Sequence, residues 1–427
     1  MSTVGLITEY NPFHNGHLYH LEASKKITNA DAVISIMSGS FVQRGEPAVI
    51  DKYTRTAMAL ANGVNLLVEL PVFYSCSSAE YFSFGAIMTL EELGVDFVCF
   101  GSECGDIGIL TYIAELLINE PVQLSMLIKE KLSSGLSYPK ARNDSLCQFI
   151  KNNNCVYDTA VVEKVLKSPN NILGIEYIKT IIKYNLSIKP FTIKRVGSDY
   201  NDINISTITP SASAIRNGFR KTINGNKGND ILQNLDKTID NLELKNSMSE
   251  NVYTLLMASL AINFPIFIDD FSMMLNSKLK YIIHNDYTQL TRYLDVNIDF
   301  AHKISNVFTG YESFTQLIEK LKNKQLTYTR VCRSLMHILL EITDETMLKY
   351  IASGTVPYIR LLGFDEVGQT FLSKIKKNCE VPIITKTANY KVLLSEDIYA
   401  TELYNIVVAS KFKTELESEY KRGAIRR

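Results

Sequence analysis

The chain has 427 residues, of which 46% are hydrophobic, and it carries 45 basic and 45 acidic side chains. This length allows two or three domains with a large core, and the hydrophobic content excludes a disordered polypeptide. The net charge of zero gives no sign of a nucleic-acid partner, so any RNA contact must use a local basic patch.

The first strand and the first helix meet at a pair of histidines. Residues 3–7 read as a buried strand and residues 18–27 as a helix, so His14 and His17 lie where the helix begins. Free N–H groups and a partial positive charge attract phosphate there, and Gly16 permits close approach to the backbone. Both histidines could be ordinary loop or cap residues. Their place directly after a first strand favours a nucleotide site.

Strands and helices alternate over the first 100 residues. The sequence predicts strands at residues 32–37, 65–70 and 96–100, with helices at 51–62 and 77–93. This pattern indicates an α/β fold with a doubly wound parallel sheet, in which ligands collect beyond the carboxyl ends of the strands. Three segments are expected to meet there: the histidine turn, residues 39–52 and residues 101–103.

The loop after the second strand is polar, contains glycine and is long for such a connection, which favours a functional loop. Gln43, Arg44, Lys52 and Arg55 could clamp phosphates or an acceptor. The alternative is a solvated loop whose charges pair on the surface. Gly101, at the end of a later strand, would let a base or ribose pass without meeting a side chain.

Residues 107–184 read as helical, and Pro169 and Asn170 mark the start of one helix. Helix capping is therefore an alternative role for Asn170. A further strand is expected at residues 187–196, and it carries Arg195.

A second phosphate cradle is expected near residue 210. Pro210 and Ser211 start a helix whose first turn offers hydroxyls and free N–H groups, and Arg216 lies one turn beyond Ser213. Such a group could steady a departing pyrophosphate. The alternative is a plain helix cap with an exposed arginine.

The remaining chain divides by composition. Residues 217–249 are rich in Asn, Lys, Gly and Asp and mark a domain boundary. Helices are expected at residues 251–261 and 329–341. Residues 351–427 look mixed, with a helix at 365–377 and strands at 381–384 and 404–408.

Cysteines and apolar runs exclude other classes. The seven cysteines include no Cys-x-x-Cys pair and no accompanying histidine cluster, which predicts reduced thiols and no protein-borne metal site. No apolar run is long enough to cross a bilayer, and residues 1–10 lack a signal-peptide pattern. We therefore expect a cytoplasmic protein without a membrane partner.

Several motifs together resemble a known family. The His-x-Gly-His turn and the Ser-x-Ser-x-x-Arg segment at residues 211–216 resemble the nucleotidyltransferase superfamily that shares its signature with class I aminoacyl-tRNA synthetases. With these, four further segments resemble bacterial tRNA(Met) cytidine acetate ligases over nearly the whole chain: Ser-Gly-Ser-Phe-Val-Gln-Arg-Gly-Glu-Pro-Ala at 38–48, Phe-Gly-Ser-Glu at 100–103, Asn-Asn-Ile-Leu-Gly at 170–174 and Arg-Ser-Leu-Met-His-Ile-Leu-Leu at 333–340.

The resemblance implies an activity and its partners. Members use ATP and acetate to form acetyl-adenylate, then transfer the acetyl group to N4 of the wobble cytidine of elongator tRNA(Met), giving N4-acetylcytidine. Mg²⁺ would be carried by ATP. The implied domains are a nucleotidyltransferase-like catalytic domain at 1–220, a linker at 221–249, a helical domain at 250–350 and a small mixed segment at 351–427 that contacts the tRNA. The oligomeric state stays open.

The resemblance also implies site residues. Catalysis is expected to involve His14 and His17 at the α-phosphate, Ser213 and Arg216 at the β and γ groups, and Lys52. The ATP site would comprise Ile7, Thr8, Glu9, Tyr10, Asn11, Pro12, Phe13, His14, Asn15, Gly16, His17, Leu18, Tyr19, His20, Gly101, Asn170 and Arg195. Asn171 could be the true counterpart of Asn170.

Two other functions compete with this interpretation. A small-molecule adenylyltransferase would use the same phosphate cradles, although it would need no large appendage after residue 245. A non-catalytic nucleotide sensor or RNA-binding adaptor is disfavoured because both cradles look intact.

Overall fold

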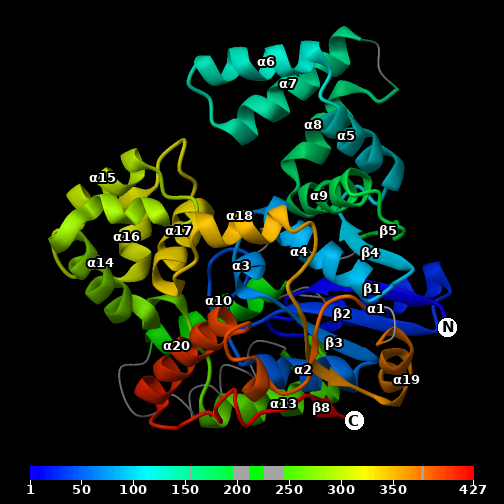
Figure 1. Ribbon diagram of the computed structural model, residues 1–427, viewed down its shortest axis with the longest axis vertical. Helices are drawn as coiled ribbons and strands as arrows, with labels where there is room; N and C mark the ends of the chain where they lie inside the picture. Colours follow the sequence, from blue (N-terminus) through cyan, green and yellow to red (C-terminus); the bar gives the residue numbers. More distant parts are fainter. Residues whose placement is uncertain (154–155, 196–210, 226–243, 377–378) are drawn as a thin grey trace.

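A central sheet organises the computed structural model, which describes residues 1–153, 156–195, 211–225, 244–376 and 379–427. The described strands form one eight-stranded sheet in the order β5-β4-β1-β2-β3-β6-β7, with β8 beside β6 (Figure 1). Its first five strands are β1 (Thr3–Thr8), β2 (Ala32–Ser38), β3 (Leu66–Leu70), β4 (Phe97–Ser102) and β5 (Lys189–Lys194).

These five strands are parallel, as the sequence predicted. β1, β2 and β3 are rich in Val, Ile and Leu and almost entirely buried, as expected for strands with helices on both faces. The chain leaves β1 toward β2 on one side and later returns to β4 on the other. The carboxyl ends of β1 and β4 therefore border the crevice where such folds bind ligands.

Helices cover both faces of the sheet. α4 (Ala79–Glu92) and α9 (Pro169–Lys183) lie on one side, whereas α2 (Lys52–Ala61) and α13 (Glu250–Ile262) lie on the other (Figure 1). α1 (Asn15–Thr28) connects β1 with β2 and packs against both. The expected helices at residues 18–27, 51–62, 77–93 and 251–261 are thereby confirmed, and the short α3 (Val72–Ser75) was not predicted.

A helical arm rises from the sheet between β4 and β5. It contains α5 (Ile107–Asn119), α6 (Val122–Ser133), α7 (Tyr138–Asn152) and α8 (Thr159–Lys167), and α9 returns the chain to the sheet. α6 and α7 pack on each other at the far end of this arm (Figure 1). The described residues between 107 and 184 are mainly helical, as predicted.

A second helical body follows residue 265 and lies beside the arm (Figure 1). It comprises η1 (Ile268–Phe271), α14 (Ser272–Asp286), η2 (Tyr287–Arg292), α15 (Ile298–Val307), α16 (Phe314–Leu321), α17 (Tyr328–Leu340) and α18 (Asp344–Ala352). None of the described helices combines the length and the apolar character that a membrane span requires.

The C-terminal segment differs from the prediction because it completes the central sheet. β6 (Ile359–Phe364) pairs antiparallel with β3, and β7 (Ile383–Ile384) and β8 (Ile425–Arg426) both pair with β6. The strands β6, β7 and β8 therefore belong to the same sheet as the N-terminal strands. The helix predicted at residues 365–377 is confirmed as α19 (Glu366–Ile375).

The strand predicted at residues 404–408 is wrong, because this segment lies within α20 (Ser395–Phe412). Tyr404, Val407 and Val408 are buried at helical spacing, and their run of apolar side chains imitates a short strand. The described part of the expected linker also differs. α10 (Ala212–Gly225) occupies its start, and α12 (Leu244–Ser247) its end. Val196, Pro210 and residues 226–243 lie outside the described residues.

Candidate active site

Two histidines build the turn between β1 and α1. His14 caps the helix in an extended conformation, and its Nδ1 accepts a hydrogen bond from the Gly16 amide at 3.0 Å. The Nδ1 of His17 accepts one from the His14 amide at 3.2 Å. The pair therefore forms a reciprocal capping box in which histidines replace the usual serine and glutamate.

Both imidazoles are neutral hydrogen-bond donors in this arrangement. Because each Nδ1 accepts an N–H, the ring proton belongs on Nε2. Burial, aided by the charges of Arg195 and Arg216, lowers the pKa of His14 to about 3. Burial also holds the pKa of His17 well below its usual value. Two uncharged donors thus remain near the start of α1, where a phosphate oxygen would be bound.

The turn that precedes the histidines is rigidly packed. The side chains of Tyr10, Asn11 and Phe13 are at most 1% exposed, and the Asn11 Oδ1 accepts the Val49 amide at 2.8 Å. The Tyr10 ring lies 4.8 Å from Phe13 and 5.1 Å from His17, between centroids. These side chains hold the turn, so they leave only backbone groups for a ligand.

Arg216 joins the second motif to the first. Its guanidinium donates to the Asn11 carbonyl at 2.8 Å and to the Ser213 hydroxyl at 3.2 Å. The Ser211 hydroxyl accepts the Ala214 amide at 3.1 Å, which is the capping role considered above. The structure therefore brings Ser213, Arg216 and the histidine turn together, as the two-cradle interpretation requires.

The end of β4 lies beside β1 at the carboxyl edge of the sheet. A Cβ on Gly101 would lie 3.2 Å from the Arg195 side chain, which is close but adjustable because that side chain is flexible. The Arg195 amide donates to the Ser102 carbonyl at 3.0 Å, so the exposed arginine directly follows the β4–β5 pair. Burial lowers the pKa of His20 to about 4, and the charge of Arg195 contributes to this shift.

Asn170 and Asn171 have different roles, although both bind Glu103. Asn171 is 1% exposed, its Oδ1 accepts the amides of Glu103 and Cys104, and its Nδ2 donates to Val165. Asn170 is half-buried and donates its Nδ2 to the Glu103 carboxylate at 2.7 Å. Asn171 is thus fully used by the fold, whereas Asn170 remains accessible to a ligand.

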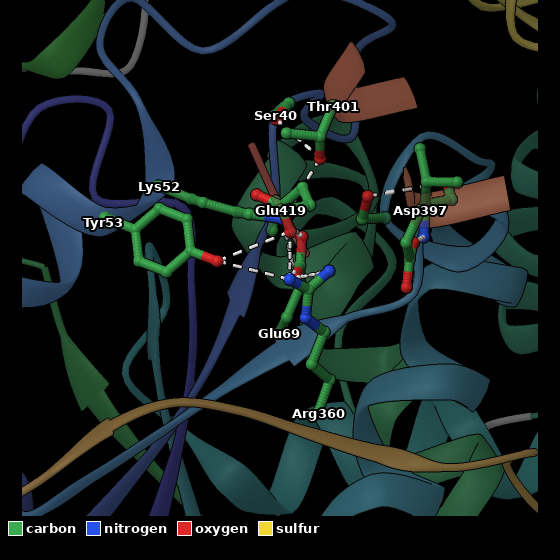
Figure 2. A network of polar contacts seen from close by, with 12 residues as sticks. Ser40, Lys52, Tyr53, Glu69, Arg360, Asp397, Thr401 and Glu419 are labelled. Carbon is green, nitrogen blue, oxygen red and sulfur yellow. Dashed lines mark hydrogen bonds and ion pairs between the residues drawn. The ribbon is translucent and has the colours of Figure 1, made fainter. Parts of the chain in front are cut away.

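Lys52 lies in a buried cluster of charges. Its side chain is 1% exposed, and its ammonium lies 2.8 Å from Glu69 and 3.1 Å from Glu419. Arg360 completes this cluster by pairing with both carboxylates (Figure 2). The charge of Lys52 is therefore buried and matched, which indicates a structural role, and its expected role in catalysis stays a prediction.

Arg55 is also structural. It is 0% exposed and donates to the carbonyls of Glu9 at 2.7 Å and Ser38 at 2.9 Å, and to that of Gly39. It therefore ties together the loops that leave β1 and β2, which shapes the crevice without presenting a charge to it. A second hydrogen bond joins the same loops, because the backbone amide of Gln43 donates to the Glu9 carboxylate at 3.1 Å.

The sequence analysis missed Arg360, Asp397 and Glu419. Arg360 lies in an apolar strand, and Glu69 interrupts the apolar β3 in the same way. A charge within such a strand is the signal that could have indicated a buried ion pair. The ion-pair partners of these strand charges could not be inferred, because they come from separate parts of the chain.

No group of three or more His, Cys, Asp or Glu side chains that could hold a metal ion occurs in the part of the chain that the structure describes. The six cysteines within that part are free thiols.

Comparisons with known proteins show which family the chain resembles. A family model described as HIGH Nucleotidyl Transferase matches residues 1–419. A tRNA(Met) cytidine acetate ligase of Clostridium perfringens is 41% identical over 424 residues, which covers 98% of each chain. One of a Thermoanaerobacter species is 40% identical over 416 residues and covers 95% of each.

Two crystal structures of Thermotoga maritima TmcAL are similar over 100% of this chain and 99% of theirs. The structure bound with alpha-thio ATP has a TM-score of 0.87 at 29% identity. The apo form has a TM-score of 0.89 at 30% identity.

Proposed function

The chain belongs to the HIGH nucleotidyl transferase family, and from this premise we propose that it is an ATP-dependent ligase acting on elongator tRNA(Met). Its relatives of nearly equal length carry the name tRNA(Met) cytidine acetate ligase. The proposed reaction has two steps. Acetate attacks the α-phosphorus of ATP and releases pyrophosphate, and the N4 amine of the wobble cytidine then attacks the acetyl carbonyl and releases AMP and a proton.

One structural observation carries the nucleotide part of this proposal: the bond from Arg216 to the Asn11 carbonyl. It unites the histidine turn with the Ser213–Arg216 turn at the crevice beside β1 and β4. The ATP-analogue complex of the Thermotoga maritima relative supports the same ligand class.

The first step needs alignment and charge stabilisation more than a covalent intermediate. Acetate is a weak nucleophile, and negative charge spreads over the phosphate oxygens as pyrophosphate leaves. We assign the Nε2–H donors of His14 and His17 to the α-phosphate oxygens. Because these neutral donors are already in position, they can stabilise the negative charge that develops on the α-phosphate oxygens in the transition state.

Arg216 and Ser213 are assigned to the β and γ phosphates. Two hydrogen bonds set the orientation of the Arg216 guanidinium, so its positive charge is in place to stabilise the departing pyrophosphate. Among the expected ATP contacts, Asn170 and Arg195 lie on the β4 side, where the Arg195 side chain packs close to Gly101.

We expect Mg²⁺ to enter the site bound to the ATP substrate. The described residues hold no cluster of metal ligands, so the triphosphate itself would carry the ion. When bound, it neutralises phosphate charge.

The second step uses a base that has left its loop. Sequence-specific RNA recognition commonly draws a base out of a loop and stacks it on an aromatic ring. The acetyl-adenylate then presents its carbonyl to the cytidine N4 amine, and AMP is the leaving group.

The test is acetylation of a defined RNA. The protein is incubated with ATP, radiolabelled acetate and an unmodified elongator tRNA(Met) transcript, and label is expected in N4-acetylcytidine after nuclease digestion. A transcript with uridine at the wobble position is the control, because it lacks the N4 amine. Absence of label under conditions where the protein binds ATP contradicts the proposal, and transfer of AMP to a small acceptor would favour an adenylyltransferase.

A further inference from the structure

A cleft separates the helical arm from the second helical body. Its volume is about 460 Å³, and its walls come from α7, α8 and the start of α17. The side-chain Nε2 of Gln325 donates to the Gly135 carbonyl at 3.4 Å and so links the two walls directly. The active-site assignments above use none of the residues that line this cleft.

The charges of the cleft are mainly positive. Lys140, Lys167, Arg330 and Arg333 line it with two carboxylates, Asp144 and Glu163, which leaves an excess of two positive charges. Lys167 pairs with Glu163 at 2.6 Å. In a chain with no net charge, this excess is a local feature that requires an explanation.

Two of these cations are free to bind an external anion. Neither Lys140 nor Arg330 forms an ion pair with any residue that the structure describes. Arg333 is held loosely, because its Nε lies 3.9 Å from the Asp295 carboxylate. The free cations stand on opposite walls, Lys140 on α7 and Arg330 on α17, so one anionic chain passing through the cleft could contact both.

A single loop connects the cleft with the candidate active site. At one end, the Gln43 amide donates to the Glu9 carboxylate in the β1–α1 turn. At the other, Gly45 has a φ of 83° and packs on α17, where a Cβ would lie 2.8 Å from the Arg333 backbone. Gly45, which contacts the cleft wall at Arg333, is therefore only two residues along the chain from Gln43, which contacts the β1–α1 turn.

We infer that this cleft binds the sugar-phosphate backbone of the tRNA beside the reacting nucleotide. The inference rests on the proposed function and adds where the RNA is held. Arginine and lysine supply most phosphate contacts in nucleic-acid complexes, and amide side chains can bond ribose hydroxyls. Asn143 and Gln325 place such amides in the cleft.

The experiment measures RNA affinity as a function of salt. Lys140→Gln, Arg330→Gln and the double variant are titrated with an unmodified elongator tRNA(Met) transcript in a filter-binding assay. Removal of two phosphate contacts is expected to weaken binding about 10-fold and to flatten the slope of log Kd against log salt by about 1 to 2. Arg330→Lys should retain most of the affinity because it keeps the charge.

The controls separate this inference from the proposed function. Lys374→Gln, on α19 away from the cleft, should bind tRNA as the unchanged protein does. Acetate-dependent pyrophosphate release from ATP without tRNA should be the same in all variants. Unchanged Kd and slope in the folded double variant would overturn the inference and leave the proposed function intact. Loss of pyrophosphate release in the double variant would also overturn it, by assigning the cleft to the nucleotide step. Failure of the unchanged protein to release pyrophosphate would instead contradict the proposed function.

Discussion

The His17 Nδ1 accepts the backbone amide of His14, and the two imidazole centroids lie 3.9 Å apart. This contact couples helix capping to the chemistry, because the same bond that fixes the start of α1 leaves a proton on Nε2 of His17. Burial keeps both rings neutral at ordinary pH. The pair therefore provides a preorganised donor site whose geometry does not depend on a change of protonation.

His17→Ala should slow acetyl-adenylate formation by about 10²–10³, the usual cost of removing one preorganised donor to a developing charge. The affinity for tRNA should stay within a few-fold of the unchanged protein. Pyrophosphate release and filter binding measure the two effects. His302→Ala is the matched control, since this histidine is exposed on α15. Equal losses in rate and RNA affinity would mean that His17 only maintains the fold.

Lys52→Met should lower the free energy of unfolding and leave kcat of the folded enzyme largely unchanged. Its removal leaves Glu69 and Glu419 sharing only Arg360 in a buried cluster, and such a broken pair typically costs about 3–5 kcal/mol. Urea unfolding measures this loss, with Lys349→Met on exposed α18 as the control. A large fall in kcat with unchanged unfolding would instead support the catalytic role that the sequence analysis expects for Lys52.

Asp397 should make stability depend on pH near neutrality. Its carboxylate accepts the Tyr358 hydroxyl at 2.6 Å and the Val72 amide at 2.7 Å. Burial, reinforced by Glu69, nevertheless raises its pKa to about 7, against the opposing effects of Tyr358, Arg360 and the Val72 amide. The folded protein thus keeps a proton that the unfolded chain, with an ordinary carboxyl pKa of 3.8, has already lost.

The sign follows from that difference in bound protons. As pH rises from about 4 to 7, Asp397 lowers the free energy of unfolding by about 1.4 kcal/mol per pH unit, because unfolding releases the proton that the folded state holds. Asp397→Asn removes this dependence, so the variant should gain stability relative to the unchanged protein between pH 5 and 7. Urea unfolding across this range is the measurement. The exposed Asp299→Asn control should run parallel to the unchanged protein, and a parallel Asp397→Asn curve would contradict the assigned pKa.

Local patterns predicted the part of the fold that local physics determines. The change from a buried strand to a helical period, with His14 at the boundary, is visible within the first 28 residues. The sequence could not show that β6 pairs with β3, or that Arg360 and Glu419 neutralise the charges around Lys52, because these partners are separated by long stretches of chain. Predicting those contacts requires the tertiary fold.

The two adjacent asparagines illustrate the same limit, because the sequence analysis expects the ATP contact at Asn170 and leaves Asn171 as the alternative. Their burial and hydrogen bonds differ. Asn171 is 1% exposed and bonds the amides of Glu103 and Cys104 and the Val165 carbonyl, whereas Asn170 bonds Glu103 at the edge of the crevice.

Asn171→Ala should therefore lower the free energy of unfolding by about 1–3 kcal/mol, because it leaves buried N–H and C=O groups without partners. Asn170→Ala should leave unfolding nearly unchanged and raise the KM for ATP. Each variant is the matched control for the other, and both are measured by urea unfolding and by acetate-dependent pyrophosphate release. A raised KM in Asn171→Ala at full stability, with Asn170→Ala unaffected, would reverse the assignment, since it would place the ligand against the buried member of the pair.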